Sequence, residues 1–196
     1  ITFVEVLAMI IKDVSIKILG GKDQIGGNII LLEHQGIKVL LDIGMPLEGT
    51  ATSNLTSSTI PDLSDVDYCL ISHAHLDHWG YMDLLPDSCV IYSGSATQSL
   101  IRITRFITHR PMISNSWRNF RTNEPIHLES FNITPFLIDH SAYDAHAFLI
   151  KVAGVNIFYT GDIRFHGRKK SLSVNLVAKL NSVPIDLLIS EGTNLS

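Results

Sequence analysis

The chain has few of the features that mark secreted or membrane-bound proteins. Its 196 residues include two cysteines, Cys69 and Cys89, both in apolar runs and without a C-x-x-C spacing. We therefore expect two buried core thiols, not a disulfide or a thiol metal site, and this usage fits a reducing, cytoplasmic setting. No apolar run reaches the roughly 18 residues that a membrane-spanning helix needs, so no membrane segment is expected.

Charge is sparse as well. Charged residues make up 17% of the chain, apolar residues 45%, and the net charge is −4. These values describe an ordinary globular protein and give no global electrostatic attraction for nucleic acid. Gly20-Gly21 and Gly26-Gly27 lack the spacing of a P-loop or a dinucleotide fingerprint, so both pairs indicate turns.

Four potential metal ligands lie within six residues, directly after the apolar run 68–72: His73, His75, Asp77 and His78. Because His73 and His75 are two residues apart, extended backbone sends both side chains from one face, where they can hold one ion. Asp77 and His78 follow at the turn into a short stretch with helical character. Imidazole and carboxylate suit zinc or manganese. The alternative is a polar loop that is histidine-rich by chance.

The segment 73–78 resembles the His-x-His-x-Asp-His signature of the metallo-β-lactamase superfamily. Three further motifs of that family match in order: 40–44, with Asp42-x-Gly44; 139–141, with a lone histidine; and 159–162, a strand ending at Asp162. The matches extend from Asp42 to Glu191, about three quarters of the chain. Together they are far more specific than any one of them alone.

Narrower matches indicate the RNase J-like, β-CASP branch, which processes nucleic acids, mostly RNA. They are residues 26–28, His140-Ser141 followed by Asp144, residues 161–168, and Glu191 followed by x-Thr. In this branch, such an acidic residue opens an inserted second domain. The resemblance implies a ribonuclease that cleaves RNA phosphodiester bonds with a metal-bridging hydroxide and has single-stranded RNA as its partner.

The resemblance also implies roles for the matching residues. Two divalent ions, zinc or else manganese, would be held by His73, His75 and His140 for one ion, Asp77 and His78 for the other, and Asp162 for both. Asp77 and Asp162 would be the catalytic carboxylates, and Asp42 would orient a ligand histidine through a hydrogen bond. The family places one more histidine ligand after the inserted domain, so we expect the second metal site to be incomplete before Ser196.

Substrate contacts are expected near the third and fourth motifs, at Ser141, Arg164, His166, Arg168 and Glu191. Arg164, His166 and Arg168 can contact a phosphate, which suits the planar guanidinium of arginine. The alternative is a solvated turn.

The stretch 88–123 has no acidic residue and interleaves arginines with aromatics, as single-strand-binding surfaces do. Its alternative, which we favour, is a helix face and loop that happen to be basic. His146 is expected to pack on a strand, and His34, His109 and His127 to lie at the surface.

Hydrophobic periodicity predicts an α/β (α+β) protein. Strands are expected at 14–19, 28–33, 37–41, 68–72, 90–92, 133–138, 147–152, 155–159 and, buried, at 186–189. Helices are expected at 95–107, with Leu100, Ile103, Phe106 and Ile107 inward, and at 171–180, with Leu172, Leu176, Val177 and Leu180 inward. Residues 49–58 are expected to form a surface loop.

This order suits the four-layer αβ/βα sandwich of the resembled family, incomplete at the carboxyl end, with the ligands on loops at one sheet edge. We expect residues 14–190 to form that domain. Residues 1–13 would be an extension or first strand, and 191–196 would begin the inserted domain. The shared ligand set leaves two other functions open: a hydrolase of a small ester, thioester or lactone, and a non-catalytic binding module or inactive fragment. A homo-oligomer is also left open.

Overall fold

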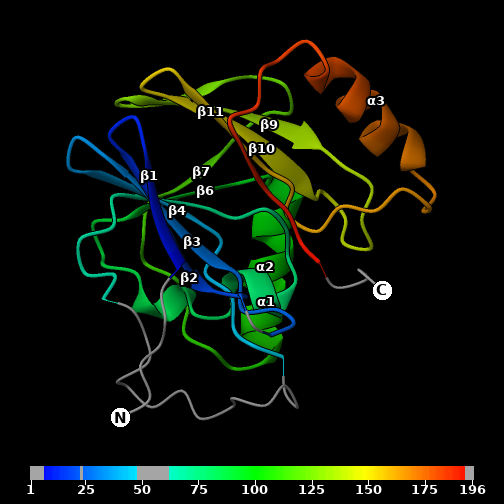
Figure 1. Ribbon diagram of the computed structural model, residues 1–196. Coiled ribbons are helices and arrows are strands. Elements are labelled where there is room, and N and C mark those ends of the chain that lie inside the picture. Colours follow the sequence, from blue (N-terminus) through cyan, green and yellow to red (C-terminus); the bar gives the residue numbers. More distant parts are fainter. Residues whose placement is uncertain (1–6, 23, 48–61, 193–196) are drawn as a thin grey trace.

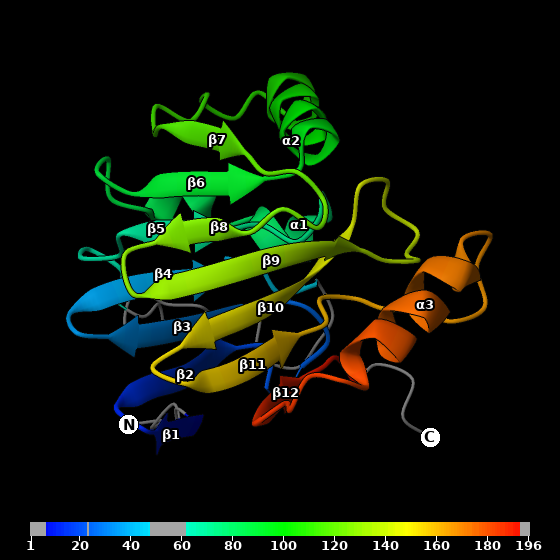
Figure 2. The same ribbon diagram turned by 90° about the horizontal axis from the view of Figure 1, so that it is seen from above.

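Two β-sheets lie face to face in this computed structural model (Figures 1 and 2), which describes residues 7–22, 24–47 and 62–192. The expected loop at 49–58 and the ends before residue 7 and after residue 192 lie outside the described residues. No helix within the described part of the chain combines the length and apolar character needed to cross a membrane.

The first sheet has seven strands in sequence order: β1 (Leu7–Ile11), β2 (Val14–Gly20), β3 (Ile29–His34), β4 (Ile37–Leu41), β5 (Tyr68–Leu70), β6 (Val90–Ser93) and β7 (Trp117–Asn119). Neighbours from β1 to β4 are antiparallel, and those from β4 to β7 are parallel. The turn between β3 and β4 has positive φ at Gln35 and Gly36, as tight hairpins require. The strands expected between residues 14 and 92 are confirmed, whereas β7 was not predicted.

The second sheet has the order β12-β11-β10-β9-β8, with β8 (Ile126–Leu128), β9 (Phe131–Leu137), β10 (His146–Val152), β11 (Val155–Tyr159) and β12 (Leu187–Ile189). The predicted hairpin of β10 and β11 is confirmed. The expectation of a buried strand at 186–189 is wrong in one respect. Among the described strands β12 pairs only with β11 and lies at the sheet edge, so Leu188 is 60% exposed.

The main core fills the space between the two sheets. Alternate residues of each strand point inward, as the two-residue period of a strand requires. The first sheet contributes residues such as Leu32, Val39 and Leu70, and the second such as Ile133, Phe148 and Ile157, all fully buried. Each such side chain contributes about 1.5–3 kcal/mol by leaving water. This core holds the two sheets, and the loops at their edges, in a fixed relation.

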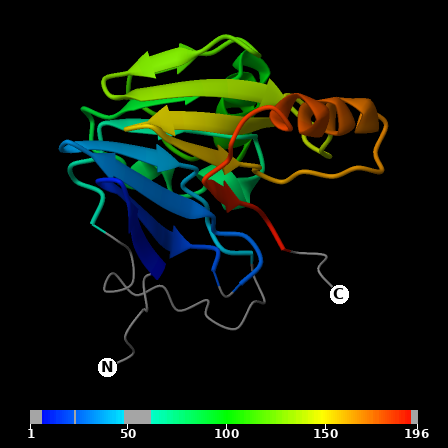
Figure 3. The ribbon, with the colours of Figure 1, turned by 45° about the horizontal axis from the view of Figure 1, so that its top comes forward.

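Helices cover the outer faces. On the first sheet, α1 (Leu76–Trp79), the 3-10 turn η1 (Met82–Leu84) and α2 (Ser95–Ile107) enclose a second core that includes Trp79, Met82 and Ile101. On the second sheet, α3 (Lys170–Leu180) encloses a third through Leu176. Figure 3 shows α3 beside the second sheet, and Figure 2 shows it apart from α2. The four-layer αβ/βα arrangement is therefore confirmed.

Helix α2 has the predicted bounds, but the predicted inward face is wrong. Thr97, Ile101 and Arg105 are buried, whereas the four residues expected inside are exposed, namely Leu100, Ile103, Phe106 and Ile107. The reason is the guanidinium of Arg105, which forms an ion pair with Asp83 and donates from Nε to the Pro111 carbonyl at 2.7 Å. A buried charge whose donors are satisfied outweighs the apolar pattern.

Other packing predictions were partly wrong. In α3, Leu176 is buried and Leu172 and Leu180 are half-buried, but Val177 is exposed. Ser173 takes the inner position because its Oγ accepts a hydrogen bond from the Asp139 N–H at 3.0 Å.

The expectation that His34 lies at the surface is wrong, because His34 is buried with Nδ1 2.9 Å from Ser130 Oγ. His109 and His127 are exposed and His146 is packed, as predicted. Cys69 and Cys89 are buried and unbonded, which confirms that prediction.

Candidate metal centre

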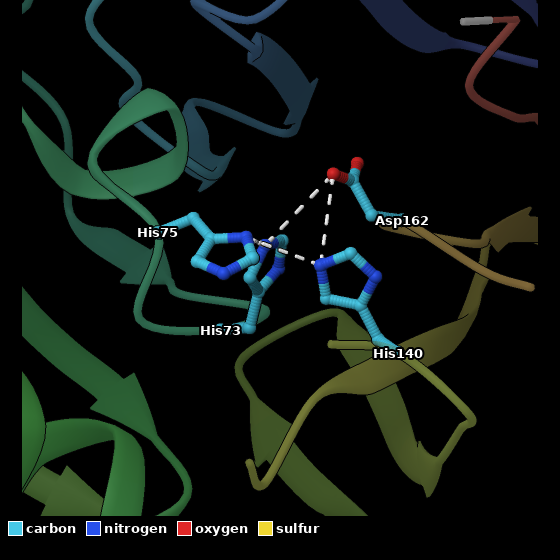
Figure 4. A group of neighbouring side chains, drawn as sticks. All are labelled: His73, His75, His140 and Asp162. Atoms are coloured by element: carbon cyan, nitrogen blue, oxygen red, sulfur yellow. Dashed lines mark hydrogen bonds and ion pairs between the residues drawn. The ribbon is translucent and has the colours of Figure 1, made fainter. Parts of the chain in front are cut away.

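The predicted ligands meet where loops leave both sheets. His73 and His75 follow β5, His140 follows β9, and Asp162 follows β11. Figure 4 shows the four side chains pointing toward one another across the gap between their loops. Helix α1, which begins directly after His75, adds Asp77 and His78 on the side of the first sheet. Two sheets held by one core thus bring together residues that are far apart in sequence.

The first group of donor atoms comprises His73, His75, His140 and Asp162. His75 Nδ1 is 3.1 Å from His73 Nε2 and 3.1 Å from His140 Nε2. Asp162 Oδ2 is 3.9 Å from the Nε2 atoms of both His73 and His140. Zinc binds nitrogen at about 2.0–2.1 Å, so two tetrahedral nitrogen ligands lie about 3.3 Å apart. The spacing and chemistry of this group therefore fit a divalent ion.

The second group comprises Asp77, His78 and Asp162. His78 Nε2 is 3.2 Å from Asp162 Oδ1 and 3.7 Å from Asp77 Oδ2. Asp162 thus directs one carboxylate oxygen toward each group. All six residues predicted as ligands come together in the predicted grouping, and their role as ligands stays a prediction.

Asp42 orients the ring of His78 from the side that faces away from the candidate metal centre. Its buried carboxylate accepts hydrogen bonds from the Ser72 N–H at 2.7 Å, Ser72 Oγ at 2.8 Å and Tyr159 Oη at 2.6 Å. His78 Nδ1 is 2.7 Å from Asp42 Oδ2. Because a carboxylate only accepts hydrogen bonds, Nδ1 of His78 carries the proton. Nε2 then faces the two groups of potential metal ligands.

Ser72 and Tyr159 were not predicted as parts of the site, although Tyr159 stands in the motif 159–162 and Ser72 ends the apolar run before the motif 73–78. Ser72 directly precedes His73, and Tyr159 ends β11 three residues before Asp162. Strand parity alone could have placed Tyr159 on the face toward the first sheet. Its partner on that sheet could not be read from local sequence.

Burial and charge divide the histidines into two kinds. Burial, together with the neighbouring imidazoles, holds the pKa of His73 well below its usual range. Burial likewise lowers the pKa of His140 to about 4, against the opposing charge of Asp162. Burial would also lower the pKa of His78, but the carboxylates of Asp42 and Asp162 outweigh it and raise that pKa to about 10. His73 and His140 are therefore neutral near pH 7, with lone pairs available to an ion.

Glycines allow the backbone to pack closely against the second group. A Cβ on Gly44 would lie 1.6 Å from the Asp77 carbonyl oxygen, and one on Gly26 would lie 2.7 Å from Asp77 Cβ. Gly26 also has φ +75°, which favours glycine. Gly26 and Gly44 therefore let the backbone support Asp77 directly, and the positive φ of Gly26 and Gly27 agrees with the turn predicted there.

The donors open onto a cleft of about 1280 Å³. His75, Asp77, His140 and Asp162 line it, together with four of the predicted substrate contacts, Ser141, Arg164, His166 and Glu191. Arg168 is exposed and does not line this cleft. The Arg164 guanidinium is already engaged, because Nη2 donates to the His140 carbonyl at 3.1 Å and to Asp139 Oδ1 at 3.3 Å.

Two arginines of the basic stretch 88–123 serve the fold, and no residue of the stretch lines the cleft. Arg105 is buried with Asp83. Arg110 donates to the Gly80 carbonyl at 2.9 Å and lies over the Trp79 ring at 5.8 Å. The structure thus favours the alternative given above, a helix face and loop that happen to be basic.

Comparison with known proteins adds an independent result. A family model described as a β-lactamase superfamily domain matches residues 38–194. Endoribonuclease ysh1 of Aspergillus fumigatus is 30% identical over 89% of this chain and 22% of its own length. Ribonuclease J of Mycobacterium tuberculosis is 27% identical over 90% of this chain and 33% of its own length. The chain thus spans a third or less of these relatives.

Among solved structures, a protein of unknown function from Enterococcus faecalis V583 superimposes with a TM-score of 0.78 at 22% identity. The match covers 92% of this chain and 50% of that one. At this level of identity the likeness concerns the fold alone.

Proposed function

Because this chain belongs to the metallo-β-lactamase superfamily, in its RNase J-like, β-CASP branch, we propose that it hydrolyses RNA phosphodiester bonds at a centre of two divalent ions. One observation carries the proposal: Asp162 directs separate oxygens toward two groups of donors that meet above one cleft. Two-ion sites with a shared ligand recur in phosphodiester hydrolysis. The names of the two relatives, both ribonucleases, support RNA as the substrate.

His73, His75 and His140 would hold one ion, Asp77 and His78 the other, and Asp162 both. Three imidazoles in one group favour zinc over manganese as the resident ion. When bound, such ions neutralise charge on phosphoryl oxygens and acidify bound water. Asp42 fixes the tautomer and orientation of His78, and Asp77 is placed to accept or return a proton at the cleft.

The size of the cleft supports a polymeric substrate. Pockets for small ligands usually have about 300–1,000 Å³, whereas this cleft has about 1280 Å³ and opens to solvent beside the centre. Ser141, Arg164, His166 and Glu191 line it and are the proposed substrate contacts. We place the reaction on single-stranded RNA in a reducing, cytoplasmic compartment, and the two buried, unbonded thiols support that setting.

The test is cleavage by the full-length protein loaded with zinc or with manganese. Labelled single-stranded RNA, double-stranded RNA and p-nitrophenyl acetate are offered in parallel. We expect cleavage of single-stranded RNA that Asp162→Asn abolishes and that Asp13→Asn, an exposed carboxylate in the β1–β2 turn, leaves unchanged. Hydrolysis of the ester alone would instead identify a small-molecule hydrolase and overturn the proposal.

A further inference from the structure

The side-chain amide of Asn28 lies beside the candidate metal centre and has no role in the predicted ligand set. Its Nδ2 is 3.1 Å from His78 Nε2, the ring atom that faces the donor groups. Asn28 also lines the cleft, together with Asp77 and Asp162. The amide is therefore next to the centre and accessible to a molecule in the cleft.

Backbone hydrogen bonds fix Asn28 to the segments that carry the centre. Its N–H donates to the Asp77 carbonyl at 3.1 Å, and its carbonyl accepts from the Gly44 N–H at 2.9 Å. One bond thus joins it to a predicted ligand, and the other to the segment that follows Asp42. Because both neighbours belong to the site, the amide keeps its position relative to the centre.

Gly21 leaves room for the Asn28 amide beside the backbone. A Cβ on Gly21 would be 2.4 Å from Asn28 Oδ1, so the oxygen occupies space that any side chain there would fill. With Oδ1 against this bare backbone, Nδ2 is the amide atom that faces His78. The glycine pair that the sequence assigned to a turn therefore also gives the Asn28 side chain the space that it occupies.

The chemistry of the centre lacks what Asn28 supplies. The predicted ligands offer lone pairs and negative charge, which suit a cation. A phosphoryl oxygen is itself negative and is stabilised by hydrogen-bond donors held in place before it arrives. Nδ2 provides N–H groups at this position and adds no charge.

We propose that the Asn28 amide donates a hydrogen bond to a phosphoryl oxygen of the substrate and is thus a further catalytic residue. This inference rests on the proposed function. Removing one such preorganised donor lowers kcat by about 10²–10³ in well-studied hydrolases. Asn28 is partly exposed to the cleft, so we expect a loss of about 10–100-fold.

The experiment compares Asn28→Ala and Asn28→Asp with Asn175→Asp, which adds the same charge on the exposed face of α3. In the metal-loaded full-length protein, kcat and KM are measured with bis(p-nitrophenyl) phosphate. The Kd for inorganic phosphate is measured by calorimetry, and bound metal by elemental analysis. We expect Asn28→Ala to lower kcat and weaken phosphate binding at unchanged metal content. Asn28→Asp should be worse, because a carboxylate repels phosphate, and Asn175→Asp should match the parent protein.

Several results would overturn the inference. If Asn28→Asp retains turnover or holds metal more tightly, Asn28 acts through its oxygen as a ligand. If both variants lose metal, the residue is structural, and if phosphate binding is unchanged in Asn28→Ala, the amide does not donate to it. The phosphate measurement does not need turnover. A parent protein that binds phosphate but cleaves no phosphodiester would refute the proposed function alone.

Discussion

Tyr159 donates a hydrogen bond to Asp42 across the interface of the two sheets, with 2.6 Å between Oη and Oδ2. Tyr159 ends β11 in the second sheet, whereas Asp42 follows β4 in the first. Both residues are buried, and the same Asp42 oxygen contacts His78 Nδ1. A residue of one sheet thus steadies a predicted ligand that the other sheet carries.

Tyr159→Phe removes this hydrogen bond and little else. Asp42 would lose one of its buried donors, so we expect the free energy of unfolding to fall by about 1–3 kcal/mol. Urea denaturation of the metal-free protein measures it. Tyr143→Phe, at an exposed tyrosine, should change stability by less than about 0.5 kcal/mol. Equal effects of the two substitutions would show that the bond to Asp42 contributes nothing.

Metal binding should release protons unequally at the two groups. At pH 8, His78 carries an extra proton because its pKa is about 10, whereas His140 is neutral because its pKa is about 4. An ion at His78 must therefore displace about one proton, and its affinity should rise about tenfold per pH unit below pH 10. An ion bound through His140 displaces none there. Calorimetry in buffers of different ionisation enthalpy counts the protons.

The matched variant for this measurement is Asp42→Asn. Its amide removes the charge that does most to raise the pKa of His78, so fewer protons should be released at pH 8. Affinity at this group should also fall about 10–100-fold, because the ring loses its orienting partner. Proton release that is the same in both proteins would contradict this account.

Asp144 connects the loop after His140 with the start of α2. Its Oδ2 accepts from the N–H groups of Ala96 and Thr97, each at 3.0 Å. We expect Asp144→Ala to lower the free energy of unfolding by about 0.5–2 kcal/mol, the usual effect of losing a helix cap. Asp144→Asn should lose less, since asparagine also caps and tolerates the φ of +65° found here. Thermal unfolding of the two variants provides the comparison, and equal losses would exclude capping.

Two alternative roles are proposed for Arg164, and metal affinity and KM separate them. If it mainly holds the His140 loop through the His140 carbonyl and Asp139, Arg164→Lys should weaken metal binding, because lysine lacks the planar fork. If it mainly contacts the substrate phosphate, KM should rise at unchanged metal content. The contacts to His140 and Asp139 favour the first outcome. We therefore expect Arg164→Lys to lower the metal affinity about 10-fold. Exposed Arg168, changed to Lys, is the control.

Local sequence predicted the cluster at residues 73–78, and the family resemblance added His140 and Asp162, whereas contacts that depend on packing alone were missed. His73 and His75 could be grouped because extended backbone sends side chains two residues apart from one face. The bond from Tyr159 to Asp42 needs two sheets in contact, which no local pattern encodes. Helix α2 failed for the same reason: its inner face depends on Arg105 meeting Asp83, and periodicity cannot identify that partner.

The origin of the ligands in both sheets has a consequence for how the protein folds. Loops of the first sheet carry four of the six predicted ligands and loops of the second sheet carry two, so neither group of ligands is complete until the two layers have docked. Such long-range contacts form slowly, after the entropy of closing large loops has been lost. An ion that binds only the assembled state then stabilises it by mass action. Metal supply would therefore control how long the finished protein survives, and not how quickly its first hairpins appear.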